Sequence, residues 1–269
     1  MTARELFEFS LIEINKVEAP SLLLEDYNYF INKAVVSYVN KRYNLYDLNQ
    51  QTTDDLRILK GEVTLTALTA KVGNKLQGAT YVGVLPQDYF HLLNCIVEYQ
   101  PTKNFKCYTT EPVHFGAKRL TSDMYSQIIN NYYMRPTYKN PYFYIHNTVD
   151  PVISDVAKEA NIRDGNTSPV NIEIRYGKDN TLFVLTKVYI DYLKVPKFIR
   201  LTEEQTALTE DTSQILEFPD YVCHEIIKEL VALLMENSSD PRLQTNIPIN
   251  QDIPSQGPQQ APAPQQRRR

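Results

Sequence analysis

The chain has 269 residues, of which 42% are hydrophobic and 22% charged, so it is long enough to bury a core without disulfide staples. Its formal charge of −4 argues against a uniformly basic nucleic-acid coat, although a local basic patch remains compatible with it. No apolar run has the length of a membrane-spanning helix, and three cysteines are too sparse and too odd a set for a disulfide scaffold.

The first 60 residues predict a helical segment. Apolar side chains recur at helical spacing over 21–42, and Ser21 is placed to cap the start of this helix. A second, short helix is expected to begin near Thr52 and to end at Gly61.

From residue 61 to about residue 200 the pattern favours β-structure. Alternating or aromatic-rich stretches predict strands, while Pro86 and Asp88 suit the first turn of a helix over 86–94, and 121–131 predicts another capped helix. The predicted strands are 62–70, 78–85, 96–100, 105–110 and 140–147.

The clearest local unit is a predicted hairpin over 170–190, with its turn at 177–180. Apolar side chains alternate along both arms. The opposite face carries Glu173, Arg175 and Lys187, so we expect that face to be wet or to contact a polar partner.

Residues 201–245 contain an acidic loop and then a helix from about Pro219 to Asn237 with a wide apolar face. We expect this face to pack on the body of the chain, the alternative being a free interaction surface. Residues 246–269 hold five Pro and six Gln and predict a disordered tail, which carries a charge of +2 while residues 1–245 carry −6.

Together these patterns predict an α+β protein with a β-sandwich or small-barrel core, its strands lying at about 62–190, flanked by N- and C-terminal helices. The expected organisation is a helical segment (1–60), a β-rich domain (61–200), a loop and C-terminal helix (201–245) and a tail (246–269).

No motif indicates catalysis or a cofactor. Nucleophile elbows, glycine-rich phosphate loops and paired zinc-ligand motifs are missing from the sequence, so we expect no cofactor, no metal and no enzymatic activity. His91 with Cys95, and Cys223 with His224, are the places where an enzymatic alternative would be sought.

The 19 tyrosines, with no tryptophan, point instead to interfaces, since tyrosine joins an apolar ring to a polar hydroxyl. A mid-chain cluster combines aromatic, basic and proline residues and predicts a loop that grips a neighbouring subunit. Half-buried strand positions and base stacking are the alternatives. The candidate interface residues are Tyr132, Tyr133, Arg135, Tyr138, Lys139 and Tyr142, together with Arg267, Arg268 and Arg269 in the tail, which suit an acidic partner surface or DNA, or are simply solvated.

Four segments resemble head–tail connector or ring proteins of the crAss-like tailed phages of gut Bacteroides. They are INKAVVSYVNKRYNLYDLNQQTTDDLRIL (31–59), LPQDYFHLL (85–93), DYLKVPKFIRLT (191–202) and LEFPDYVCHEIIKELVALLMENSSDPRLQT (216–245). The last is the most telling, because an apolar helix opened by FPDYV and closed by a DPRxQT-like end is similar to one in phage adaptor and ring proteins. The stretch 94–190 is largely unmatched.

The resemblance implies a virion structural protein, made in the host cytoplasm, twelve copies of which assemble into a ring. Its implied partners are the portal protein, adjacent ring or tail proteins, and genomic DNA that passes through the channel without sequence-specific binding; no membrane is involved. The alternative is a monomeric assembly factor or binding module that is not retained in the virion.

Overall fold

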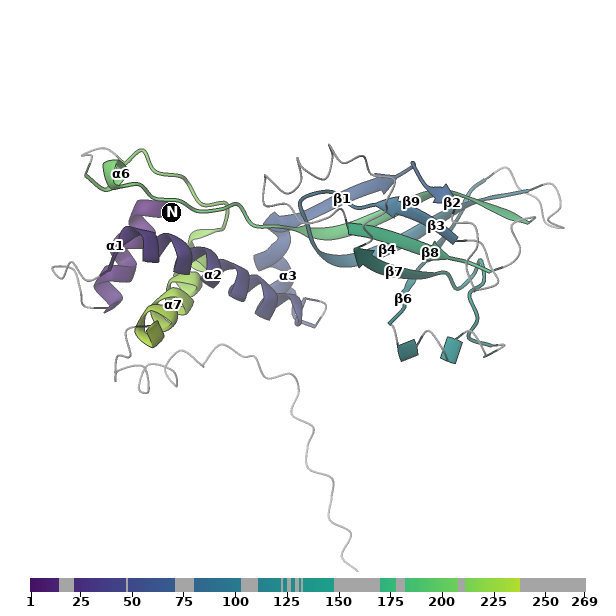
Figure 1. Cartoon of the computed structure of the whole chain (residues 1–269), viewed down its shortest axis with the longest axis horizontal. Helices are drawn as coiled ribbons and strands as arrows, with labels where there is room; N and C mark the ends of the chain where they lie inside the picture. Colours follow the sequence, from purple (N-terminus) through teal and green to yellow (C-terminus); the bar gives the residue numbers. More distant parts are fainter. Residues whose placement is uncertain are drawn as a thin grey trace, which may run out of the picture. The chain divides into compact units, whose positions relative to one another are not determined.

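The computed structural model describes residues 1–14, 22–46, 48–70, 80–102, 111–121, 123–124, 127–128, 131, 133–147, 170–177, 182–207 and 211–237 (Figure 1). The chain divides into a helical unit, Met1–Ile58 with Pro196–Arg269, and a β-unit, Leu59–Val195. The predicted N-terminal and C-terminal helical segments therefore belong to one unit. The predicted tail, 246–269, lies outside the described residues.

The helical unit joins segments from both ends of the sequence. Its helices are α1 (Ala3–Ile14), α2 (Leu24–Tyr43), α3 (Gln50–Leu56), α6 (Glu203–Ala207) and α7 (Asp220–Asn237), with the 3₁₀ turn η1 (Arg57–Leu59) after α3. The two ends are tied by an isolated bridge between Thr2 and Ile215 and by an ion pair from the Met1 amino group to Asp220 at 2.7 Å. None of the described helices combines the length and hydropathy that crossing a membrane requires.

Helix α7 forms the centre of this unit. It packs against α1 and α2, and the apolar face predicted from its sequence is almost wholly buried: Val222, Ile226, Ile227, Leu230, Val231 and Leu234. Each fully buried aliphatic side chain contributes about 1.5–3 kcal/mol relative to its exposed state. Of the two alternatives for this face, core packing is the one observed.

A buried charged cluster also links α2, α3 and α7. The Arg42 guanidinium donates to Glu225 at 2.5 Å and lies 3.9 Å from the Asp55 carboxylate, with all three side chains largely shielded from solvent. Burial raises the pKa of Asp55, and Arg42 opposes that rise. Each buried charge thus has an opposite charge close by, which is the condition under which such groups are tolerated in a core.

The β-unit contains two mostly antiparallel sheets. One has the strand order β1-β9-β4-β5 and the other β2-β3-β8-β7-β6, in which only β6 and β7 run parallel. The strands are β1 (Lys60–Leu65), β2 (Thr69–Ala70), β3 (Thr80–Val84), β4 (Tyr89–Pro101), β5 (Val113–Gly116), β6 (Lys118–Arg119), β7 (Tyr142–Asn147), β8 (Val170–Arg175) and β9 (Phe183–Lys194).

One apolar core joins the two sheets. Cys95, Val97 and Tyr99 of β4 belong to the same buried cluster as Ile172 and Ile174 of β8. Inward-facing residues of two sheets that share a core are the mark of a sandwich. The α+β prediction is confirmed, with helices at both ends of the sequence, and the barrel alternative is wrong because the strands form two sheets and not one closed barrel.

The helix predicted over 86–94 is wrong. Only a turn follows Pro86, and from Tyr89 the chain runs as strand β4, which pairs with β9 along its whole length through several register shifts. The run YFHLL satisfies helical and strand periods alike, and its length does not discriminate. Pairing with β9 decides the outcome because it supplies partners for the backbone of a strand rich in aromatic side chains.

The hairpin predicted over 170–190 is also wrong, because β8 and β9 lie in different sheets. Alternation identifies the side of each strand that faces the core but not its pairing partner, and both inner sides face the same core. The outer side of β8 differs from the prediction too. Glu173 and Arg175 are buried and form an ion pair. Lys187 belongs to β9 in the other sheet, where it lies 3.5 Å from the Glu98 carboxylate of the neighbouring strand β4.

Candidate interaction surface

The candidate site lies on the side of α2 that turns away from the helical core. Residues one turn apart on the inner side, Tyr27, Ile31 and Tyr38, are buried, as amphipathic patterning predicts. The outer side also carries apolar groups, since Tyr29 is 65% exposed and Val36 is 39% exposed. An amphipathic surface helix normally presents a polar face there, so this patch requires an explanation.

An extended segment, 196–202, runs along α2, and we call it the strap. Two asparagines of α2, four residues apart, bind its backbone on alternate residues. Asn32 donates to the Ile199 carbonyl at 2.8 Å and accepts from the Ile199 N–H at 2.9 Å. Asn28 makes the same pair of bonds to Leu201, both at 2.8 Å.

This asparagine ladder sets the direction of every strap side chain. Successive side chains of an extended chain point to opposite sides. Ile199 and Leu201 are buried, whereas the alternate residues Phe198 and Arg200 are exposed. The strap is fixed further at its start, where Glu217 accepts a hydrogen bond from the Lys197 N–H at 2.9 Å. The strap is therefore held in one conformation without a β-partner.

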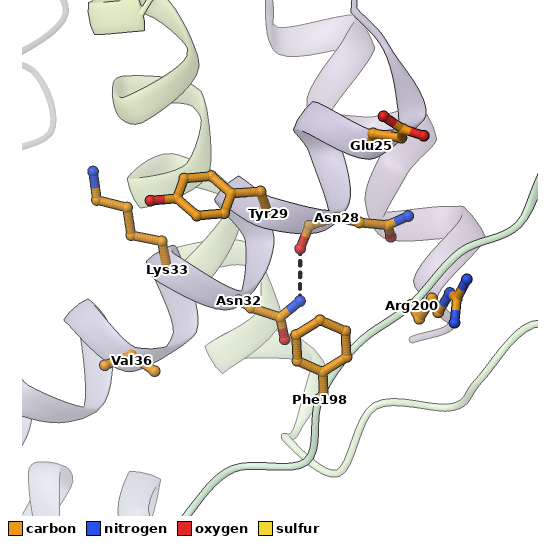
Figure 2. Close-up of a pocket in the computed structure, with 8 residues that line it drawn as sticks. All are labelled: Glu25, Asn28, Tyr29, Asn32, Lys33, Val36, Phe198 and Arg200. Carbon is orange, nitrogen blue, oxygen red and sulfur yellow. Dashed lines mark hydrogen bonds between the residues drawn. The ribbon is translucent and has the colours of Figure 1, made fainter. Parts of the chain in front are cut away.

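The outer side of α2 and the outward side chains of the strap enclose a groove of about 710 Å³, which we call the α2–strap groove (Figure 2). In Figure 2 the Phe198 ring stands beside Asn32, and Tyr29 projects from the neighbouring turn of α2. The lining residues are Glu25, Asn28, Tyr29, Asn32, Lys33, Val36, Phe198 and Arg200.

The charges of the groove are few and mixed. Lys33 and Arg200 are exposed cations, and Glu25 is an exposed carboxylate at the start of α2. The Lys33 ammonium lies 5.8 Å from the centre of the Phe30 ring on α2, which is within cation–π distance. The groove thus presents two aromatic rings, an aliphatic side chain and charged groups.

The interface residues predicted from the sequence are not one surface. Tyr133 is 92% exposed, and Arg135 and Lys139 are exposed beside it. Tyr138 instead stacks on Phe183, with ring centres 4.2 Å apart, and Tyr142 is buried in β7 against Leu120 and Ile128. Tyr132, Arg267, Arg268 and Arg269 lie outside the described residues.

The two sulfur–imidazole pairs lie in different units of the chain. His91 and Cys95 lie on β4 and not on a helix, while Cys223 is buried in α7 and His224 beside it is exposed. Burial raises the pKa of Cys95 to about 12 and that of Cys223 to about 11, so both thiols stay protonated near neutral pH. Within the residues that the structure describes, no group of three or more His, Cys, Asp or Glu side chains is placed to hold a metal ion.

The groove was missed by reasoning from the sequence. Half of its wall, the strap, is separated from α2 by more than 150 residues and has no periodicity of its own. A signal was present in α2, where Asn28 and Asn32 share a side with Tyr29 and Lys33, but side-chain amides four residues apart also suit a solvated face.

Neither a protein-family model nor a curated protein sequence matches this chain.

Proposed function

We propose that this chain is a non-enzymatic virion structural protein, a subunit of an oligomeric ring in the portal or tail of a tailed phage, where it lines or seals the DNA channel. The observation that carries the proposal is the preformed α2–strap groove. Its exposed aromatic surface is already in place in the single chain, as a docking surface requires.

Ring assembly explains why such a groove would be kept rigid. A head-to-tail ring joins two different surfaces of the same chain, and each must be complementary to the other. Ordering a loop at an interface weakens binding by about 0.5–1.5 kcal/mol for each immobilised side chain. Because Asn28 and Asn32 fix the strap beforehand, that ordering has already taken place.

A second exposed surface is available on the β-unit. Tyr133 and Met134 are exposed apolar side chains beside Arg135, a combination of residue types that is enriched at interfaces. A ring subunit also contacts the rings above and below it, so more than one such surface is expected. The portal protein and adjacent ring or tail proteins are the proposed partners.

The charge of the chain suits a conduit for DNA. Residues 1–245 carry a formal charge of −6, and an acidic channel wall does not gain the counterion release that makes basic proteins bind phosphates tightly. DNA would therefore pass without sequence-specific binding. The four segments that resemble connector proteins support the same proposal; one of them contains the strap, and another contains the part of α2 from Ile31 onward.

Quantitative mass spectrometry of purified phage particles tests this proposal. A ring subunit is expected in mature particles at a fixed whole-number ratio to the portal subunit, and it should remain after washing with high salt. If the chain is abundant in infected cells but missing from mature particles, the proposal fails. The assembly-factor alternative then takes its place.

A further inference from the structure

We propose that the α2–strap groove binds the proline-rich segment 246–264 of a second copy of this chain. This inference rests on the proposed function, because it supplies the second of the two surfaces that a head-to-tail ring requires. Residues 246–264 contain five prolines and three isoleucines and only one charged side chain, Asp252.

The chemistry of the groove matches such a segment. Proline-rich chains favour the polyproline II conformation, which projects apolar ridges and leaves its carbonyl groups free to accept hydrogen bonds. Aromatic-lined grooves recognise these ridges in other proline-rich segments, and residues 246–264 offer prolines at 254, 258, 262 and 264 in place of a PxxP spacing. Here Phe198 and Tyr29 supply the rings, and Lys33 and Arg200 supply donors and a countercharge for Asp252.

The fixed backbone angle of proline strengthens the argument. A segment with few accessible conformations loses little entropy when it is bound, so an open groove of moderate size can hold it. The groove also loses little entropy on binding, since the hydrogen bonds from Asn28 and Asn32 already hold the strap.

The proposed ring favours a neighbouring copy over the segment's own chain as the source of the segment. Helix α7 packs against α2, whose buried residues include Tyr27, Ile31 and Tyr38. The groove opens on the other side, which carries Tyr29, Lys33 and Val36. In a head-to-tail ring a surface of the neighbouring copy faces this groove, and residues 246–264 of that copy would supply it.

Photo-crosslinking within the full chain tests this assignment. The photoreactive residue p-benzoylphenylalanine replaces Phe198, and equal amounts of ¹⁵N-labelled and unlabelled chain are mixed with portal protein and irradiated. Trypsin should cut after Arg242 and Arg267, so the segment is recovered as one peptide, 243–267. We expect this peptide to be crosslinked to the strap peptide in mixed-isotope pairs, which arise only between two copies.

Two matched variants complete the experiment. The same photoreactive residue at Leu48, which is 75% exposed in the same unit but does not line the groove, should give at least tenfold less of this crosslink. Replacing Pro254, Pro258, Pro262 and Pro264 by serine should lower the crosslink at Phe198 several-fold, with the thermal melting temperature unchanged.

The outcomes separate this inference from the proposed function. Crosslinks confined to a single isotope, or the absence of peptide 243–267 from the products, would overturn the inference. The native mass of the same irradiated sample reports the ring independently. A ring without the crosslink would remove the inference alone, whereas a sample that holds only monomers would remove the proposed function as well.

Discussion

Asn28 and Asn32 show how two side chains can replace a β-strand. Each amide group presents one donor and one acceptor, as a residue of a neighbouring strand would, and their spacing of four residues on a helix aligns them with alternate residues of the extended strap. The strap backbone is thereby satisfied without a sheet. The exposed positions of Phe198 and Arg200 depend on this arrangement.

Asn32→Ala tests this role. The Ile199 N–H and carbonyl would lose their partners at a part-buried position, which costs about 1–3 kcal/mol in the free energy of unfolding. Urea unfolding measures that loss, and amide hydrogen exchange shows where it occurs. Protection should fall at Ile199, whereas Asn28→Ala should affect Leu201. Equal exchange at both sites in the wild type and the two variants would contradict the ladder.

Arg42 has a different role, since it neutralises carboxylates inside the helical unit. We expect Arg42→Met to lower the free energy of unfolding by about 3 kcal/mol at pH 7, because the buried Asp55 and the half-buried Glu225 would remain without their cation. Lys41→Met is the matched control. It removes a neighbouring ion pair between Lys41 and Glu229. The Lys41 side chain is 62% exposed, so this pair contributes less than about 1 kcal/mol.

The same variant has a predictable pH dependence. The pKa of Asp55 is raised by burial, and Arg42 holds that rise down, so removing Arg42 raises the pKa of Asp55 further. A group whose pKa is higher in the folded state stabilises the fold as the pH falls through that pKa. The difference in the free energy of unfolding between the wild type and Arg42→Met, measured by urea unfolding, should therefore become smaller as the pH falls from 7 to 5. A constant deficit over this range would contradict the assigned role of Asp55.

At the scale of elements, Gly177 fixes the loop that carries the exposed Tyr133. Gly177 has φ +85°, and a β-carbon there would lie 2.6 Å from the Pro136 carbonyl oxygen. The end of β8 and the loop before β7 therefore touch backbone to backbone. Only glycine permits both this contact and the left-handed conformation at low cost.

Gly177→Ala should consequently lower the melting temperature by several degrees, since strain and the steric overlap together cost about 1–3 kcal/mol. Gly116→Ala in β5 is the matched control, because nothing lies within 4 Å of a β-carbon built there. Differential scanning calorimetry compares the two variants. Equal melting temperatures would show that the close approach at Pro136 does not hold the loop.

Elements with long, regular patterns were predictable from the sequence. Helices α2 and α7 follow from periodicity, because each buries one side against a neighbour and the sequence must repeat accordingly. Strand β7 follows from its aromatic-rich composition. Strand β4 was not predictable from its first half, since the run YFHLL fits either period. The pairing of β8 was not predictable either, because alternation carries no information about the partner strand.

The candidate site was less predictable than the fold. The tyrosine cluster attracted the interface prediction by composition, yet Tyr138 and Tyr142 pack inward with Phe183 and Ile128. The α2–strap groove is formed by segments from the two ends of the sequence, which meet only in the folded helical unit. Long-range pairing of this kind leaves no local pattern that could be identified in advance.

At the scale of the whole molecule, the chain is built as two units with separate cores. The β-unit is one continuous stretch, Leu59–Val195, inserted between the two parts of the helical unit. Each unit carries an exposed apolar surface, the α2–strap groove on one and the Tyr133–Met134 loop on the other. We propose that these surfaces join copies to one another and to neighbouring rings.

The native mass of the assembled protein tests this account most directly. Native mass spectrometry and electron micrographs of the full chain, alone and with portal protein, should show a closed ring of defined copy number, and Phe198→Ala should weaken ring formation while Leu48→Ala should not. A strict monomer of 31.1 kDa in every mixture, with the portal present, would contradict the account.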